Sequence, residues 1–393
     1  MTPEIFLAAP VRTAIGKFGG SLVDVKAPDL AAHAVRESLR RAALDPVQVD
    51  TLILGHARQA ASGPNPARQV AKLAGLPFAK PAYTVNQACA SGLRAIVNAA
   101  SEILLGESEV VVAAGVESMS NTPYFLPRAR WGYKLGSAEV VDGMYRDGFI
   151  CPLCGQLMGE TAENLAAQYA IGRDEQDAYA VETQARCEQA RKAGRFAAEI
   201  VPIEFKVGKE TRVLSEDEHP RDGVTLASLT GLKPVFRKDG TVHAGNSSGI
   251  TDGAAALLVL SGAAAARLHI TPMARLVAWT QAGVDPAVMG IGPVPAMRKL
   301  YDKTGLKPDD FDLIELNEAF AAQVLACDRE LHFDRERLNV NGGAIALGHP
   351  IGATGARIVV TLLHELARRG AHRGVATLCV SGGMGMALAV ERV

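Results

Sequence analysis

The chain has 393 residues, of which 48% are hydrophobic and 21% charged, and its formal net charge is -1. This composition is typical of a folded globular protein and argues against a disordered chain or a disulfide-rich secreted scaffold. It also lacks the basic balance of a nucleic-acid-binding protein, so we expect small molecules or further copies of the chain as partners. The length predicts two or three domains.

The first residues, MTPEIFLAAPVRT, lack the basic and apolar segments of a signal peptide, and no apolar run reaches membrane-spanning length. We therefore expect a cytoplasmic protein that does not bind membranes. The chain has six cysteines. In a reducing compartment these are more typical of buried, ligating or catalytic thiols than of disulfides.

The N-terminal part predicts an α/β unit. Short apolar runs at 3–9 and 51–55 predict strands, and residues 28–43 have helical spacing after a proline start. From Gly92 to Gly106 the apolar residues recur every three or four positions, which predicts a largely buried helix that ends at a glycine. Residues 109–115, EVVVAAG, then predict a buried strand.

The C-terminal part repeats this order. The segment DLIELNEAF corresponds to DTLILGHAR, and each precedes a glycine-rich turn, a helix and a buried strand. Cys89 follows Asp50 by 39 residues, and His349 follows Asp312 by 37 residues. We infer an internal duplication that places Cys89 and His349 at the starts of equivalent helices.

Between these units lies a more polar region. A long polar helix is expected at 173–194 and a charged stretch at 208–223, which together indicate an inserted loop domain. The second unit is expected to contain a helix over 355–370 and a strand over 374–383. The predicted boundaries are 1–120 with 249–271 for the first unit, 121–248 for the loop domain and 272–393 for the second unit.

Cys89 is the first candidate for chemistry. It lies in the segment NQACASG, on a turn just before a buried helix. Free amide donors and the helix dipole stabilise negative charge there, so we expect a lowered thiol pKa and a nucleophile. The alternative is a small buried hydrophobic residue, because free cysteine is among the most buried residue types.

Three further residues stand in segments that could take part in catalysis. His349 lies between two glycine pairs and could take a proton from a thiol, although a single loop histidine is usually a surface residue. Cys379 ends a buried strand, before small residues whose amides could bind an oxyanion, and its alternative role is strand packing. Asn317 ends another buried run, where its amide could position a water or an imidazole.

Together these segments resemble the thiolase family. The family pattern is Asn-x-x-Cys-x-Ser-Gly, Asn-Glu-Ala-Phe, Gly-His-Pro-x-Gly and Cys-x-x-Gly-Gly, and the chain has it in order at 86–92, 317–320, 348–352 and 379–383. The resemblance covers essentially the whole chain. It implies an α/β thiolase fold, in which two duplicated α/β units form a layered αβαβα core with an inserted loop domain.

The resemblance also implies an acyltransferase that carries out reversible Claisen condensation and thiolytic cleavage of 3-ketoacyl-CoA, including synthesis of acetoacetyl-CoA from two acetyl-CoA. Cys89 would form the acyl-enzyme, with its thiol activated by His349, and Cys379 would move the proton at the carbon alpha to the thioester. Backbone amides near Cys89 and Ser381 would hold one oxyanion. His349 and a water on Asn317 would hold the other.

Coenzyme A is then a substrate, and no other cofactor or metal is required. The resemblance implies contacts to acyl-CoA from Arg221, Ser228, Ala244, Ser248, Leu157, Met158 and Phe320. It also implies a homodimer or homotetramer that acts in fatty acid metabolism, including beta-oxidation. Segment 121–145, with Trp131 among its aromatic residues, is the expected interface.

Two residues depart from the family pattern. Leu157 stands where many acetoacetyl-specific members have histidine, which favours longer acyl chains. Ser381 stands where the family usually has glycine, and its backbone amide can still donate unless the site requires a positive φ.

Some patterns carry less weight. Cys151 and Cys154 form a C-x-x-C motif, but no second pair follows at zinc-finger spacing and no redox fold is predicted around them. Cys187 and Cys327 are expected to pack within helices. Two alternative functions are a ketoacyl synthase, which would lack the late Cys379, and a silent thiolase-like lipid-binding or scaffolding protein, which would be expected to lose Cys89 or His349.

Overall fold

The computed structural model describes residues 3–393. Its core is one mixed sheet in the order β15-β16-β17-β14-β1-β13-β5-β3-β4, with β10 and β2 attached at its side. The strands are β1 (Ile5–Thr13), β2 (Gly16–Lys17), β3 (Thr51–His56), β4 (Ala82–Val85), β5 (Val110–Ser118), β10 (Ile200–Val201), β13 (Thr251–Ser261), β14 (Ala274–Gly283), β15 (Leu313–Leu316), β16 (Arg373–Val380) and β17 (Met384–Arg392).

The two halves of this sheet have the same pairing pattern. In the first half β3 and β5 are parallel, and β5, β13 and β1 then pair antiparallel. In the second half β15 and β16 are parallel, and β16, β17 and β14 pair antiparallel. The predicted duplication is therefore confirmed. The halves are continuous because Phe6 pairs with Arg275 and Leu7 with Ala274, a junction that the sequence did not predict.

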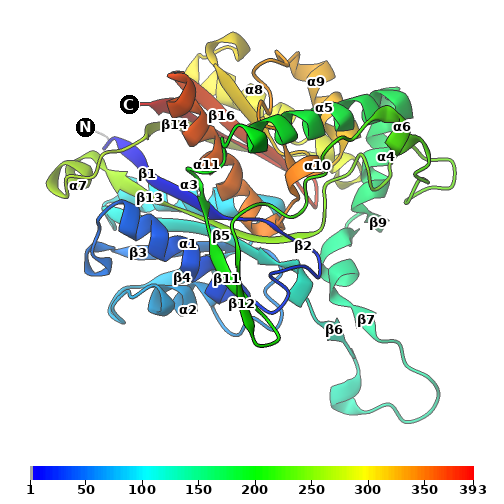
Figure 1. The fold of residues 1–393 in the computed structure, drawn as a ribbon, viewed down its shortest axis with the longest axis horizontal. Coiled ribbons are helices and arrows are strands. Elements are labelled where there is room, and N and C mark those ends of the chain that lie inside the picture. The colour runs from blue at the N-terminus through cyan, green and yellow to red at the C-terminus, as the bar shows by residue number, and fades with distance from the viewer. Residues whose placement is uncertain (1–2) are drawn as a thin grey trace.

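Helices cover both faces of each half (Figure 1). The first half packs its outer face against α1 (Ala27–Arg41) and α2 (Pro66–Leu73). Between the halves lie α3 (Ser91–Leu105) and α11 (Ile351–Arg369), which share one hydrophobic cluster with strands of both. The second half packs its outer face against α8 (Pro293–Thr304) and α9 (Ala321–Leu331). This is the predicted αβαβα order.

The central helices α3 and α11 approach closely at glycines. A Cβ on Gly92 would lie 2.7 Å from the backbone nitrogen of Ala356, and one on Gly355 would lie 2.3 Å from that of Leu93. Real side chains do not fit at such distances, so the two helices depend on glycine here. The close contact brings the N-terminal ends of α3 and α11, and with them Cys89 and His349, to the same region.

Helix α3 and the turn before it are strongly apolar. By length and composition alone, Ala88–Leu105 could cross a membrane, but 61% of this stretch is buried inside the protein. Because it packs between the two half-sheets, the stretch is explained as a core helix.

Between β5 and β13 the chain runs largely outside the sheet and joins it only at the short strand β10, which pairs with β1. The intervening residues form α4 (Met158–Gln168), α5 (Arg173–Lys192), α6 (Leu226–Thr230) and the hairpins of β6 (Tyr124–Phe125) with β7 (Val141–Asp142), β8 (Ile150–Cys151) with β9 (Gln156–Leu157), and β11 (Ile203–Val207) with β12 (Glu210–Leu214). Figure 1 shows the β6 and β7 segment reaching away from the body of the protein. Two further short α-helices are α7 (Gly262–Arg267) and α10 (Ala344–Leu347).

Candidate active site

A cavity of about 360 Å³ opens between the ends of the central helices and the inserted region. Most of the site residues expected from the sequence line it: Cys89, His349, Ser381, Leu157, Met158, Phe320, Arg221, Ala244 and Ser248. These residues come from distant parts of the chain. The fold therefore brings both units and the inserted region to one pocket.

Cys89 is held on a tight 3-10 turn, Ala88–Ala90, that precedes α3. Ala88 has a φ of 47°, which costs a non-glycine residue on the order of 1 kcal/mol. Side chains support this turn: the Ala88 amide donates to Oδ1 of Asn86 at 2.9 Å, and Oγ of Ser91 accepts from the Gln87 amide at 2.9 Å. The strained turn places the Cys89 thiol on the cavity wall.

The pKa of Cys89 is raised, contrary to our expectation of a lowered thiol pKa. Burial is the main cause, and it outweighs the Ser381 amide and the positive charge of Arg58, which both act in the opposite direction. The sequence suggests the helix start but does not show how completely the surrounding layers bury it. At neutral pH the resting thiol is therefore protonated and needs a base.

Ser381 presents its backbone amide to the Cys89 thiol. The positive φ values of this turn belong to Gly382, at 88°, and Gly383, at 83°. Ser381 is not among the positive-φ residues of the stretch 3–393. Serine in place of the family's glycine therefore leaves the amide donor in position without backbone strain.

His349 lies directly before α11 and is buried on the cavity wall. Its Nδ1 lies 2.7 Å from Oγ1 of Thr354, whereas Nε2 has no hydrogen-bond partner in the part of the chain that the structure describes. Burial, with smaller contributions from Arg357 and Arg58, lowers its pKa to about 3. The imidazole is therefore neutral at physiological pH and offers a lone pair to the cavity.

Asn317 and Cys379 lie behind this wall and are almost completely buried. Both polar atoms of the Asn317 amide lack a partner among residues 3–393. Cys379 packs with Ala319 and Phe320, and burial, followed by the nearby Cys89, raises its pKa well above the ordinary value. Cys379 is therefore a proton-bearing thiol next to the first cysteine.

The segment from Ala244 to Ser248 runs beside the Asn-Glu-Ala-Phe loop. The Ser248 amide donates to the carbonyl of Ala319 at 3.0 Å, and the Ala321 amide donates to that of Asn246 at 2.9 Å. Ser228 differs from the other expected coenzyme A contacts because it is exposed on α6 and lies outside the cavity wall.

Two known domain families match the sequence, and together they cover nearly the whole chain. Residues 5–263 match the thiolase N-terminal domain and residues 270–392 match the thiolase C-terminal domain. The chain belongs to the thiolase family. It is thus an acyltransferase, and the alternatives of a ketoacyl synthase and a silent thiolase-like protein are set aside.

Individual relatives agree with this assignment. The acetyl-CoA acetyltransferase of Cupriavidus necator is 50% identical over 390 residues, which is 99% of each chain. That of Escherichia coli is 48% identical over 388 residues, or 98% of each chain. Among solved structures, Bacillus anthracis acetyl-CoA acetyltransferase has a TM-score of 0.97 and 47% identity, covering 100% of this chain and 99% of its own. Human mitochondrial 3-ketoacyl-CoA thiolase in complex with CoA has a TM-score of 0.96 and 42% identity, covering 100% and 98%.

Two charged or titratable residues of this thiolase site were missed by the sequence analysis. Arg58 lines the cavity just after β3, and its buried Nε has no partner in residues 3–393. The signal was a cation at the end of a buried strand. His219 also lines the cavity, donates from Nδ1 to the Ala346 carbonyl at 2.7 Å, and has a pKa lowered by burial. It lies in the charged stretch 208–223, where no motif marks it, so the sequence offered no signal.

The other four cysteines of the thiolase are not among the residues that line the cavity. Cys151 pairs with Gln156 in the β8 and β9 hairpin, and Cys154 lies in its turn. Cys187 and Cys327 are buried within α5 and α9, where a packing role was expected. Across residues 3–393, no group of three or more His, Cys, Asp and Glu side chains is arranged to hold a metal ion.

Proposed function

We propose that this thiolase catalyses the reversible cleavage and formation of 3-ketoacyl-CoA, including acetoacetyl-CoA, through an acyl group carried on Cys89. The observation that supports it best is the convergence of three groups on one cavity. These are the Cys89 thiol, the Ser381 amide and the unpartnered Nε2 of His349. A nucleophile, an oxyanion donor and a base are what acyl transfer to a thiol requires.

In cleavage, His349 Nε2 takes the proton of Cys89, and the sulfur attacks the 3-keto carbonyl. The amides of Cys89 and Ser381 hold the resulting oxyanion. When the bond between C2 and C3 breaks, the acyl group stays on Cys89 and the electron pair remains on C2 as an enolate. After Cys379 has protonated the enolate and the resulting acyl-CoA has left, the thiol of a coenzyme A gives its proton to the Cys379 thiolate and attacks the acyl-cysteine. The shortened acyl-CoA is released, and the Cys89 sulfur takes back the proton held by His349.

Cys379 supplies the proton that the enolate needs. Its raised pKa keeps the thiol protonated until a strong base such as the enolate forms beside it. The enolate oxygen can be held by His349 Nε2 and by a water on Asn317, whose buried atoms otherwise lack partners within residues 3–393. In condensation the same groups act in reverse.

Coenzyme A binding involves the inserted region. Arg221, Ala244 and Ser248 line the cavity and are assigned to the part of coenzyme A that enters it. Ser228 on α6 lies outside the wall and is assigned to the part that remains outside. Leu157, Met158 and Phe320 give the acyl end an apolar lining. The human thiolase of the same fold, at 42% identity, is in complex with CoA, which supports coenzyme A as a ligand of this chain.

Two cysteine variants test the division of roles. Coenzyme A-dependent loss of acetoacetyl-CoA measures the overall reaction, and mass spectrometry measures acylation of the protein by acetyl-CoA. Cys89→Ser is expected to abolish acylation. Cys379→Ser is expected to retain acylation but to lower kcat by about 10²–10⁴-fold and to block proton exchange at the acetyl methyl group. Equal loss of acylation in both variants would show that the roles are assigned wrongly.

The assembly and location of the enzyme are part of the same proposal. Segment 121–145 exposes Trp131 by 82% and Leu135 by 98%, and large exposed apolar residues favour an interface. We assign this segment to contacts in a homodimer or homotetramer. All six cysteines are free, which supports a cytoplasmic enzyme of fatty acid metabolism.

A further inference from the structure

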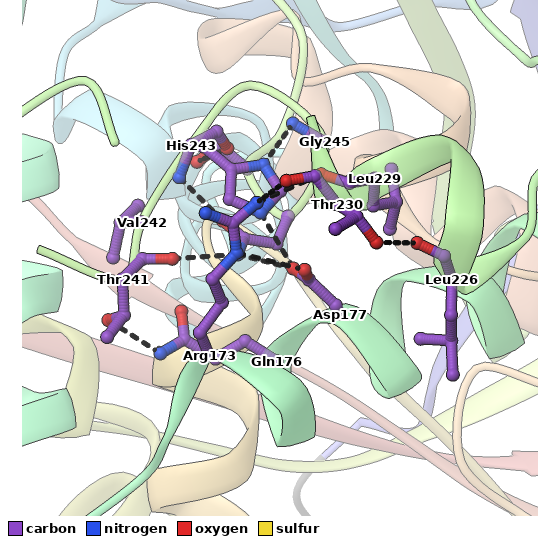
Figure 2. A network of polar contacts seen from close by, with 12 residues as sticks. Arg173, Gln176, Asp177, Leu226, Leu229, Thr230, Thr241, Val242, His243 and Gly245 are labelled. Carbon is purple, nitrogen blue, oxygen red and sulfur yellow. Dashed lines mark hydrogen bonds and ion pairs between the residues drawn. The ribbon is translucent and has the colours of Figure 1, made fainter. Parts of the chain in front are cut away.

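A buried carboxylate at the start of α5 joins two segments of the inserted region (Figure 2). Oδ1 of Asp177 accepts from Nε2 of His243 at 2.7 Å and from Nδ2 of Asn246 at 3.0 Å. Its Oδ2 accepts from Nε of Arg173 at 3.3 Å. One carboxylate thus binds three donors from two different parts of the chain.

The hydrogen bonds of His243 fix its tautomer. The Gly245 amide donates to Nδ1 of His243 at 3.0 Å, so Nδ1 carries no proton and Nε2–H donates to Asp177. The same segment closes on itself: Oδ1 of Asn246 accepts from the His243 amide at 2.8 Å, and the Ser247 hydroxyl donates to the His243 carbonyl at 2.9 Å. Residues 243–247 therefore have a single shape while Asp177 holds them.

Arg173 extends the network to α6. Its guanidinium donates to the carbonyl of Leu229 at 2.9 Å and to that of Thr230 at 3.4 Å, at the end of the helix that carries Ser228. Asp177 and Arg173 together set the spacing between α6 and segment 243–247. These are the two segments that carry Ser228 and Ala244, two of the assigned coenzyme A contacts.

The network itself lies behind the cavity wall. Ala244, Ser247 and Ser248 line the cavity, whereas Arg173, Asp177 and His243 are not among its lining residues. A buried charged group is costly, and an apolar replacement of the same shape is often as stable. A role in positioning its neighbours therefore explains the buried Asp177 carboxylate better than a contribution to stability does.

On the basis of the proposed function, we propose that Asp177 is a positioning residue for coenzyme A, acting through His243 on segment 243–247 and through Arg173 on α6. The network holds the segments that grip the coenzyme A portion of the substrate. The acyl portion depends on Cys89, Ser381 and His349, which Asp177 does not contact.

Two thioesters separate these portions of the substrate. Acetyl-CoA carries the whole coenzyme, whereas acetyl-N-acetylcysteamine carries only the sulfur end. Asp177→Ala is expected to slow Cys89 acylation by subsaturating acetyl-CoA about tenfold, equivalent to about 1.4 kcal/mol of binding. It should leave the maximal rate and the rate with acetyl-N-acetylcysteamine unchanged. Asp177→Asn keeps an oxygen that accepts from His243 and should recover part of the loss.

A control on the same helix turn is Glu175→Gln. It removes the ion pair that Glu175 forms with Arg329 at 2.8 Å, a pair outside the network. The control should acylate like the wild type with both thioesters. If Asp177→Ala does not fold, Arg173→Met carries the test, because this partly exposed side chain makes the contacts to α6 and one bond to Oδ2 of Asp177, and its loss leaves the bonds of Oδ1 to His243 and Asn246 in place. Arg173→Met should slow Cys89 acylation by acetyl-CoA, by a smaller factor than Asp177→Ala, and should leave acylation by acetyl-N-acetylcysteamine unchanged.

Two results for Asp177→Ala would overturn the proposal. An equal fall in acylation rate with both thioesters would mean that the network shapes the whole pocket. An unchanged acylation rate with both would mean that the network does not position coenzyme A. Failure of the proposed function is recognised separately, because wild-type Cys89 would then be acylated by neither thioester.

Discussion

Thr354 fixes the proton of His349 on Nδ1. The Thr354 hydroxyl has one proton and donates it to the Pro350 carbonyl at 3.0 Å, so its oxygen, 2.7 Å from Nδ1, must accept from the imidazole. Nε2 is left with a lone pair that faces the cavity. Because Thr354 keeps the imidazole proton on Nδ1, Nε2 is free to act as a base.

The neutral state of His349 predicts loss of stability in acid. Its pKa is about 3 in the folded protein, against about 6.5 in the unfolded chain. Unfolding therefore takes up a proton between these values, and the stabilising contribution is present above pH 6.5 and lost as the pH falls toward 3. Each such group contributes a slope of about 1.4 kcal/mol per pH unit.

Urea unfolding between pH 7 and pH 4.5 measures this slope. His349→Asn is expected to reduce it by about the amount of one group, whereas slope that remains is expected in part from His219, whose pKa burial also lowers. An unchanged slope in His349→Asn would contradict the assignment of a buried, neutral imidazole.

Iodoacetamide should alkylate Cys89 at least ten times faster than any other cysteine, because only Cys89 lies on the cavity wall with His349. Because burial raises the pKa of Cys89, its thiol needs a base to react, and the rate of Cys89 alkylation should fall in His349→Asn. Peptide mapping after brief labelling measures each site. Preferential labelling of Cys154, the partly exposed cysteine of the hairpin turn, would count against this prediction.

Local patterns in the sequence were enough for most of the fold. The apolar spacing from Gly92 to Gly106 corresponds to α3, and the run at 109–115 corresponds to β5. The helix expected at 355–370 begins earlier, at Ile351. The missed turn contains Gly352, which weakens helix propensity but is required where α11 packs closely on the backbone of Val116.

The sequence also identified the site residues that belong to motifs, but it did not predict the burial around them. Cys89 stands at a helix start as predicted, yet its pKa is set by burial in layers formed by distant segments. Arg58 and His219 belong to no motif, and only the tertiary fold brings them to the cavity. Spacing along a chain can predict a helix terminus but not the desolvation around it.

The exposed apolar residues of segment 121–145 predict an oligomer in solution. Leu135→Asp with Trp131→Ala should lower the molar mass measured by light scattering, because both side chains are largely exposed in the single chain. Leu105→Asp is a matched control, since Leu105 is 74% exposed at the end of α3 and outside this segment. A wild-type monomer at micromolar concentration would disprove the prediction.

Leu157 predicts activity on acyl chains longer than acetoacetyl. It lines the cavity with Met158, Phe236 and Phe320, which form an apolar surface. Each methylene that such a surface buries gains about 0.8 kcal/mol. We therefore expect 3-ketoacyl-CoA of six or more carbons to be cleaved at least as well as acetoacetyl-CoA.

The measurement is kcat/KM for cleavage of substrates from four to twelve carbons, with Leu157→His as the matched variant. Histidine replaces apolar surface by a polar group, so the variant should shift preference toward four carbons without loss of Cys89 acylation by acetyl-CoA. A steep fall beyond four carbons in the wild type would instead place it with its acetyl-CoA acetyltransferase relatives. That outcome would leave the roles of Cys89, His349 and Cys379 intact, because the chain-length prediction depends on the lining of the cavity and not on the reacting groups.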